Sequence, residues 1–107
     1  MEQVIEFLLK NAGKFAKAKA NRIYLEEFRK SKKALLMKEA ELAGVNTASG
    51  QERDAYAHPE YRELLEGLKE AVEIEEKLRW QLIAAQMKVD LFRTESANNR
   101  NLERNTL

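Results

Sequence analysis

Residues 59–101 read PEYRELLEGLKEAVEIEEKLRWQLIAAQMKVDLFRTESANNRN. At positions a and d of a heptad repeat this segment carries a row of mostly apolar or small residues: Tyr61, Leu64, Leu68, Ala71, Glu75, Leu78, Leu82, Ala85, Val89, Phe92 and Ser96. Such a row, held for about five heptads, is typical of long helices that pack lengthwise. A helix of this size is roughly 60 Å long and needs partner helices to cover its apolar side.

The composition agrees with long helices. The chain has 107 residues, one Pro, four Gly and 35% charged residues, which predicts one all-α domain. It has no Cys, which excludes a disulfide framework and thiolate metal sites. No apolar run approaches the roughly 20 residues needed to span a bilayer. Met1 to Leu9 contain Glu2 and Glu6 and lack a basic opening, so we expect no signal peptide and a cytoplasmic location.

Residues that favour the start or the end of a helix divide the single domain, residues 1–107, into three predicted helices and a tail. The predicted elements are a helix over 2–43, a short helix over 49–57, a helix over 59–101 and a frayed tail over 102–107. Gly44 suits a left-handed C-cap, and Ser49 followed by Glu52 has the spacing of a capping box. His58 is expected to cap a helix or contact the loop beside Pro59, which is favoured at a first helical position.

Two long helices joined by roughly fifteen residues predict a coiled-coil-like antiparallel hairpin. Placing Ala43 beside Glu60 aligns a basic block, Lys10–Lys38, with an acidic block, Glu52–Glu76. Opposite charges across a helix pair select its register and orientation. This alignment predicts Lys30 near Glu73, Lys33 near Glu70, Lys38 near Glu66, and Glu75 near Arg29.

Apolar residues of the first helix fall into two groups. Val4, Ile5, Leu8, Ala12 and Phe15 form an early apolar face. The later apolar face consists of Ile23, Leu25, Phe28, Leu35, Leu36 and Leu42. Within it, Phe28, Leu35 and Leu42 are spaced by seven, which matches the heptad register of the long C-terminal helix.

A second apolar row lies on the long helix away from its a/d positions. It consists of Trp80, Ile83, Ala84, Met87 and Leu91. A hairpin covers only one side of the helix, and an exposed apolar patch of this size usually marks an interface. The row therefore predicts contact with a second chain, most simply in a twofold dimer that forms a four-helix arrangement. The alternative is that the N-terminal segment, with Val4, Phe7, Leu8 and Phe15, folds over it.

Residues that carry chemistry are scarce. His58 is the single His, and with no Cys a zinc site or a Cys/His nucleophile is not expected. Acidic residues recur at helical spacing at Glu63, Glu66, Glu70, Glu73 and Glu76, without the Glu-x-x-His pairs of di-metal bundles. A Gly-rich phosphate loop is also missing. We expect no catalysis, no metal and no cofactor.

Nucleic-acid binding is the main alternative function. Lys10, Lys14 and Lys17 share one helix face, and Lys30 and Lys33 share another. Together with Arg29 they are candidate phosphate contacts. The net charge of only +1 and the acidic block opposite weigh against this function. A membrane-surface helix is the weaker alternative, because the wide apolar faces suit a bundle better, and we expect no membrane contact.

Four short stretches stand out: Tyr24-Leu25-Glu26-Glu27-Phe28-Arg29-Lys30, Ala57-His58-Pro59-Glu60-Tyr61, Leu78-Arg79-Trp80 and Arg93-Thr94-Glu95. These stretches resemble sequences of small helical proteins of tailed phages and prophages. The resemblance implies an accessory protein of the bacterial cytoplasm that binds a phage or host protein, encoded among recombination and replication genes. It carries over no functional residue. The sequence thus predicts a non-enzymatic protein-interaction module and homodimer, with a nucleic-acid-binding accessory protein as the alternative.

Overall fold

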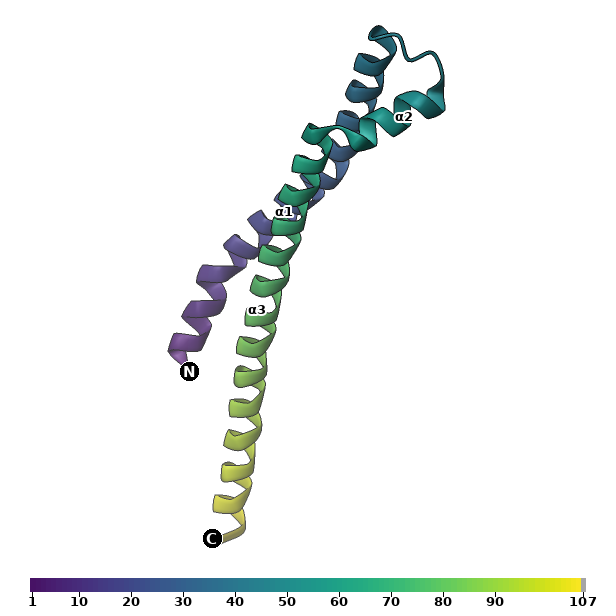
Figure 1. The fold of residues 1–107 in the computed structure, drawn as a ribbon. Coiled ribbons are helices and arrows are strands. Elements are labelled where there is room, and N and C mark those ends of the chain that lie inside the picture. The colour runs from purple at the N-terminus through teal and green to yellow at the C-terminus, as the bar shows by residue number, and fades with distance from the viewer. Residues whose placement is uncertain (107) are drawn as a thin grey trace. The chain divides into compact units, whose positions relative to one another are not determined.

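A computed structural model describes residues 1–106, which form three α-helices: α1 (Glu2–Leu42), α2 (Ala48–Ala57) and α3 (Pro59–Thr106) (Figure 1). The all-helical prediction is confirmed. Within residues 1–106, no helix is both long enough and apolar enough to cross a membrane. The chain divides into two compact units that share α1 and α3. We call residues 18–75 the corner unit, and residues 1–17 with those from Glu76 onward the terminal unit.

The end of α1 is closed by a Schellman motif, which confirms the predicted role of Gly44. This glycine has φ of 104°, a left-handed angle that residues with a side chain rarely adopt. The Gly44 amide donates to the Glu41 carbonyl at 3.1 Å, and the Val45 amide donates to the Ala40 carbonyl at 3.0 Å. These are the two hydrogen bonds that define the motif.

Helix α2 begins one residue earlier than predicted, because Thr47 rather than Ser49 is its N-cap. The Thr47 Oγ1 accepts a hydrogen bond from the Gly50 amide at 3.1 Å. A Cβ on Gly50 would lie 2.8 Å from that oxygen and 2.9 Å from Val45 Cγ1. Glycine at this position therefore lets the cap and the preceding loop approach the first turn closely.

Helix α3 begins at His58-Pro59 as predicted. The Glu60 amide donates to Nδ1 of His58 at 3.0 Å, which satisfies one of the free amides of the first turn. This contact confirms the capping role of His58. At the other end, α3 continues to Thr106 and not only to residue 101, so residues 102–106 of the predicted frayed tail are helical. Arg104 in the last turn complements the negative end of the helix dipole. Residue 107 lies outside the described residues.

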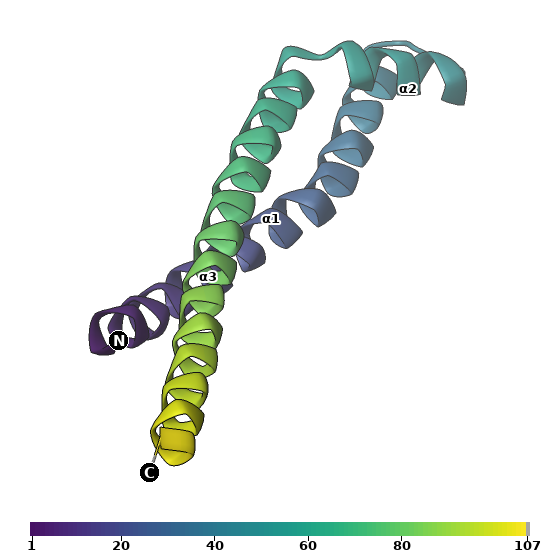
Figure 2. The same ribbon diagram turned by 90° about the horizontal axis from the view of Figure 1, so that it is seen from below.

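The best-packed part of the corner unit lies where its three helices meet. Leu36 of α1, Ala55 of α2 and Tyr61 of α3 are buried together, and Met37 packs against them. Ala55 is fully buried, so no larger side chain fits there without displacing its neighbours. In both ribbon views α2 lies beside the C-terminal part of α1 (Figures 1 and 2).

Ion pairs show that the predicted alignment of α1 with α3 is wrong. Lys32, and not Ala43, lies beside Glu60, with Nζ and Oε2 separated by 2.8 Å. The end of α1 continues past the start of α3 and packs against α2 instead, because the connection is occupied by a ten-residue helix. As a consequence Lys30 pairs with Glu27 and Lys33 with Glu52. These contacts replace the predicted pairs of Lys30 with Glu73 and of Lys33 with Glu70.

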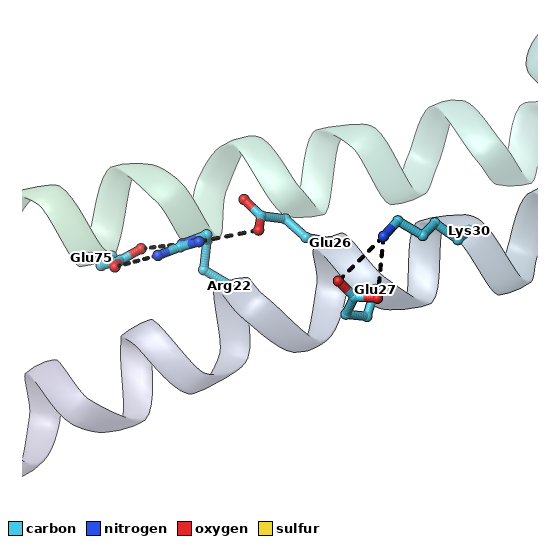
Figure 3. Close-up of polar contacts among 5 residues, drawn as sticks. All are labelled: Arg22, Glu26, Glu27, Lys30 and Glu75. Carbon is cyan, nitrogen blue, oxygen red and sulfur yellow. Dashed lines mark hydrogen bonds and ion pairs between the residues drawn. The ribbon is translucent and has the colours of Figure 1, made fainter.

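The partner of Glu75 changes with the alignment. Arg22, one heptad before the predicted Arg29, donates to both carboxylate oxygens of Glu75 and also to Glu26 (Figure 3). Glu75 is buried and its position is still a heptad a position, so the ion pair replaces an apolar layer between α1 and α3. Hydrogen bonding to Glu75, and then to Glu26, raises the pKa of the Arg22 guanidinium against an opposing effect of burial.

The later apolar face of α1 is only partly packed in the corner unit. Leu36 is buried and Leu25 half-buried, whereas Phe28, Leu35 and Leu42 are 37%, 59% and 81% exposed. A row of buried or half-buried residues at intervals of three or four runs instead through Arg22, Leu25, Arg29, Lys32, Leu36 and Ala40. The heptad spacing of the apolar side chains was therefore misleading, since the true contact row of α1 contains three cations. The a/d row of α3 is confirmed from Tyr61 to Val89, since each of its members there is buried or half-buried.

Candidate protein–protein interface

In the terminal unit, the first turns of α1 run antiparallel to α3. One open groove is lined by Gln3, Val4 and Phe7 together with Gln81, Ala84, Ala85 and Lys88. A second open groove is lined by Leu8, Leu9, Ala12 and Phe15 together with Arg79, Leu82, Ile83 and Gln86. The contact row of α1 here is Val4, Leu8, Asn11 and Phe15. Asn11 is buried and its side-chain amide donates to the Phe7 carbonyl at 2.8 Å.

This arrangement divides the predicted apolar row on α3. Ile83 and Ala84 each line a groove beside α1. Trp80, Met87 and Leu91 remain 59%, 64% and 59% exposed. The N-terminal segment thus reaches the edges of the row without covering its largest side chains, so internal coverage is incomplete within the described chain.

Four of the predicted residues form a continuous stripe along α3. Trp80, Ala84, Met87 and Leu91 follow one another at intervals of four, three and four residues, the spacing of a second heptad row. We call these four residues the outer stripe. Ile83 stands one position aside, next to α1. A helix with two heptad rows can pack against two different partners at once.

A cation lies against the ring of Trp80. The guanidinium carbon of Arg79 lies 5.0 Å from the centre of the indole, within cation–π distance. Glu76 accepts hydrogen bonds from Arg79 at 2.8 and 3.1 Å and holds the guanidinium in place. Arg79 thus lies against one face of the indole, while more than half of the Trp80 surface remains exposed to a partner.

The exposed apolar surface of the terminal unit extends past the start of α1. Since Gln3 and Val4 lie beside Ala85 and Lys88, the later turns of α3 continue beyond the N-terminus (Figure 1). Phe92, on the a/d row, is 48% exposed, and Leu102 is 63% exposed. The sequence prediction missed this overhang because it aligned the two helices nearly end to end.

A second exposed apolar row lies on α1 in the corner unit. Tyr24, Phe28, Leu35 and Leu42 belong to it, with exposures between 37% and 81%. Tyr24 stacks on Phe28 with ring centres 5.9 Å apart, so part of each ring is already covered. Ser31 and Lys38 occupy the intervening heptad positions. This row is consequently less continuous than the outer stripe.

The candidate nucleic-acid contacts do not share one environment. Lys10, Lys14 and Lys17 are exposed in the terminal unit. In the corner unit Arg29 is half-buried in the contact row, while Lys30 pairs with Glu27. Three of the six candidates therefore form an exposed basic set.

Lys33 has a structural role within the corner unit. Its Nζ lies 4.7 Å from the ring centre of Tyr56 and 3.4 Å from the Glu52 carboxylate. Contact with Tyr56, and then with Glu52, raises the pKa of Lys33. Tyr56 in turn packs edge-on against Tyr61, with ring centres 5.3 Å apart. Lys33 thus stabilises the junction of α1 with α2, which makes it a poor phosphate contact.

Acidic side chains are not gathered into a metal site. Among residues 1–106 no group of three or more His, Cys, Asp or Glu side chains could hold a metal ion. Glu60 of the acidic block pairs with Lys32, Glu75 with Arg22, and Glu76 with Arg79. The acidic block thus supplies ion-pair partners to both units.

Comparisons with known proteins give no relative that would assign a function. No family model, no curated protein and no solved structure matches the chain. The similarity to small phage proteins, and the association with recombination or replication that it implies, therefore stays a prediction.

Proposed function

We propose that the protein is a non-enzymatic interaction module that self-associates through the outer stripe. The observation that carries the proposal is the exposure of Trp80, Met87 and Leu91 on a helix whose opposite side is already packed. The simplest closed assembly is a twofold dimer in which two helical pairs form a four-helix arrangement. A phage or host protein as a further partner is a prediction from the resemblance alone.

The size of the stripe supports association of moderate strength. Full burial of a Trp, Met or Leu side chain contributes about 1.5–3 kcal/mol, and these three side chains are already partly covered. Burial of these side chains from two copies therefore contributes on the order of 10 kcal/mol to the free energy of association. The loss of translational and rotational freedom opposes it by about 4–15 kcal/mol. The dimer should consequently form in a concentration-dependent way.

Sedimentation equilibrium tests this proposal. We expect the mass to rise from monomer toward dimer between roughly micromolar and near-millimolar concentration. Met87→Glu places a charge in the stripe and should keep the chain monomeric with unchanged helical circular dichroism. Leu35→Glu is the matched control, since Leu35 is as exposed as Trp80 but belongs to the other apolar row. A monomeric wild type, or loss of the dimer in Leu35→Glu alone, would refute the proposal.

The exposed basic set favours nucleic-acid binding as a second candidate function. Lys10, Lys14 and Lys17 follow i, i+4, i+7 spacing, and the terminal unit has nine Lys and Arg against six Asp and Glu. The corner unit has ten Lys and Arg against twelve Asp and Glu. Positive charge of this kind attracts phosphate backbones without sequence preference.

Fluorescence anisotropy with single- and double-stranded oligonucleotides tests this function. If the three lysines contact phosphates of a duplex, the logarithm of affinity should fall with the logarithm of salt concentration with a slope of about −2.7. Lys10→Gln, Lys14→Gln and Lys17→Gln combined should abolish binding, while Lys30→Gln should not. The absence of binding at low salt would eliminate this candidate.

A further inference from the structure

We infer that the partner seated on the outer stripe is a second copy of this chain in antiparallel orientation, with Trp80 against the partner's Leu91 and Ala84 against the partner's Met87. The inference rests on the proposed function and adds the occupant, the orientation and the register. It follows from three properties of the terminal unit: the symmetry of the stripe, the sizes of its side chains and the charges beside it.

The stripe is symmetric about a point between Ala84 and Met87. Trp80 and Leu91 lie at equal distances from this point, and Lys77 and Thr94 end the apolar row one step farther on each side. A twofold axis through the point superposes the apolar stripe on its own copy and brings each polar end to the opposite polar end. The same patch on both partners is the requirement of an isologous interface.

Side-chain volumes favour the antiparallel arrangement. In a parallel dimer the layers would pair Trp80 with Trp80 and Ala84 with Ala84, so a bulky layer would hold the helices apart beside a nearly empty one. In the antiparallel dimer the small Ala84 lies opposite the long, adaptable Met87, and Trp80 lies opposite Leu91. Alternating large and small residues across facing positions fills such layers without voids.

Charges beside the stripe disfavour the parallel arrangement. With the stripe as the contact row, Asp90 and Glu95 occupy its two flanking heptad positions. A parallel dimer places Asp90 of one copy beside the partner's Glu95, and Lys77 beside the partner's Lys77. Like charges at these positions repel and determine which orientation a coiled coil adopts. In the antiparallel dimer Lys77 instead faces Thr94, and Asp90 lies beside Ile83, so these repulsions are absent.

Distances between spin labels separate the two orientations. The chain has no Cys, so single substitutions give one label per copy. Arg100→Cys lies on an exposed turn of α3 away from the stripe. At 1.5 Å per residue, two such labels should be roughly 45–55 Å apart in the antiparallel dimer and roughly 20–30 Å apart in a parallel one, because they point away from the partner helix. Gln86→Cys lies level with the proposed axis along α3, on the side that lines a groove beside α1. It should give a short distance in either case.

The outcomes distinguish this inference from the proposed function. A dimeric mass with a long Arg100→Cys distance and a short Gln86→Cys distance supports the antiparallel dimer. A dimeric mass with short distances at both sites overturns the orientation and leaves self-association in place. A dimeric mass with a long distance at Gln86→Cys overturns the use of the outer stripe. A monomeric mass for unlabelled protein at the highest concentration overturns the proposed function as well.

Discussion

The Arg22 guanidinium binds the Glu75 carboxylate through two parallel hydrogen bonds, from Nε at 2.6 Å and from a terminal nitrogen at 3.0 Å (Figure 3). This bidentate geometry is the strongest form of carboxylate recognition by a side chain. Because Glu75 is buried on the contact row of α3, the pair can form only in one register of α1 against α3 in the corner unit. A single polar layer of this kind specifies helix register.

We expect Arg22→Met to lower the urea midpoint of unfolding, because it removes the guanidinium from a buried carboxylate. Glu75→Leu combined with Arg22→Met should recover much of the loss, since an apolar pair of similar volume fits the layer. A double-mutant cycle measured by urea denaturation gives the coupling. Equal destabilisation in the single and the double variant would contradict a register role for the pair.

Gly13→Ala should stabilise the protein by about 0.5–1 kcal/mol. Gly13 lies inside α1, and a Cβ there meets no atom within 4 Å, so alanine gains helix propensity without a clash. The check is the shift in urea midpoint at unchanged slope. Gly67→Ala, equally free of contacts within α3, should behave in the same way.

Gly50→Ala should have the opposite effect. The added Cβ would come within 3 Å of Thr47 Oγ1 and Val45 Cγ1, so the N-cap of α2 would have to move. Loss of an N-cap costs about 0.5–2 kcal/mol, and Thr47→Ala should show a loss of similar size. If the two substitutions act on the same cap, their combined effect in thermal unfolding should be smaller than the sum.

Acid should weaken the contact between α1 and the start of α3. The hydrogen bond and charge of Lys32 lower the pKa of Glu60 below its ordinary value of 4.5. A carboxylate with a depressed folded-state pKa contributes stability above its unfolded-state pKa and loses it as the pH falls through the folded-state pKa. Urea midpoints measured from pH 6 down to about pH 3 should therefore fall less steeply in Glu60→Gln than in wild type. Glu66→Gln, exposed on the same helix, is the control.

Trp80 provides a direct optical test of the outer stripe, because it is the single Trp of the chain. Self-association should shift its emission to shorter wavelength and reduce quenching by acrylamide as the concentration rises, since the indole leaves water. Met87→Glu should remove this concentration dependence. An emission spectrum that stays constant while the mass doubles would show that the dimer uses another surface.

Local sequence patterns correctly predicted the three helices, the packed side of α3 and two of the capping residues. The a/d spacing from Tyr61 to Val89 identified the packed side of α3, because heptad geometry depends only on helical periodicity. Gly44 and His58 were correctly predicted as capping residues, because a helix cap is formed by residues that are near one another in the sequence. The outer stripe was recognised in the sequence as an apolar row on α3 outside the a/d positions.

The register between helices depended on the tertiary structure. The predicted contact of Ala43 with Glu60 was wrong, because α2 packs through Ala55 against the end of α1. The start of α3 therefore lies beside Lys32 of α1. That shift exchanges Arg29 for Arg22 as the partner of Glu75 and leaves Leu35 exposed. Periodicity identified the packed face of α3, but a pattern that repeats every heptad does not determine which residues of α1 lie beside it. The contacts among the three helices of the corner unit decide that register.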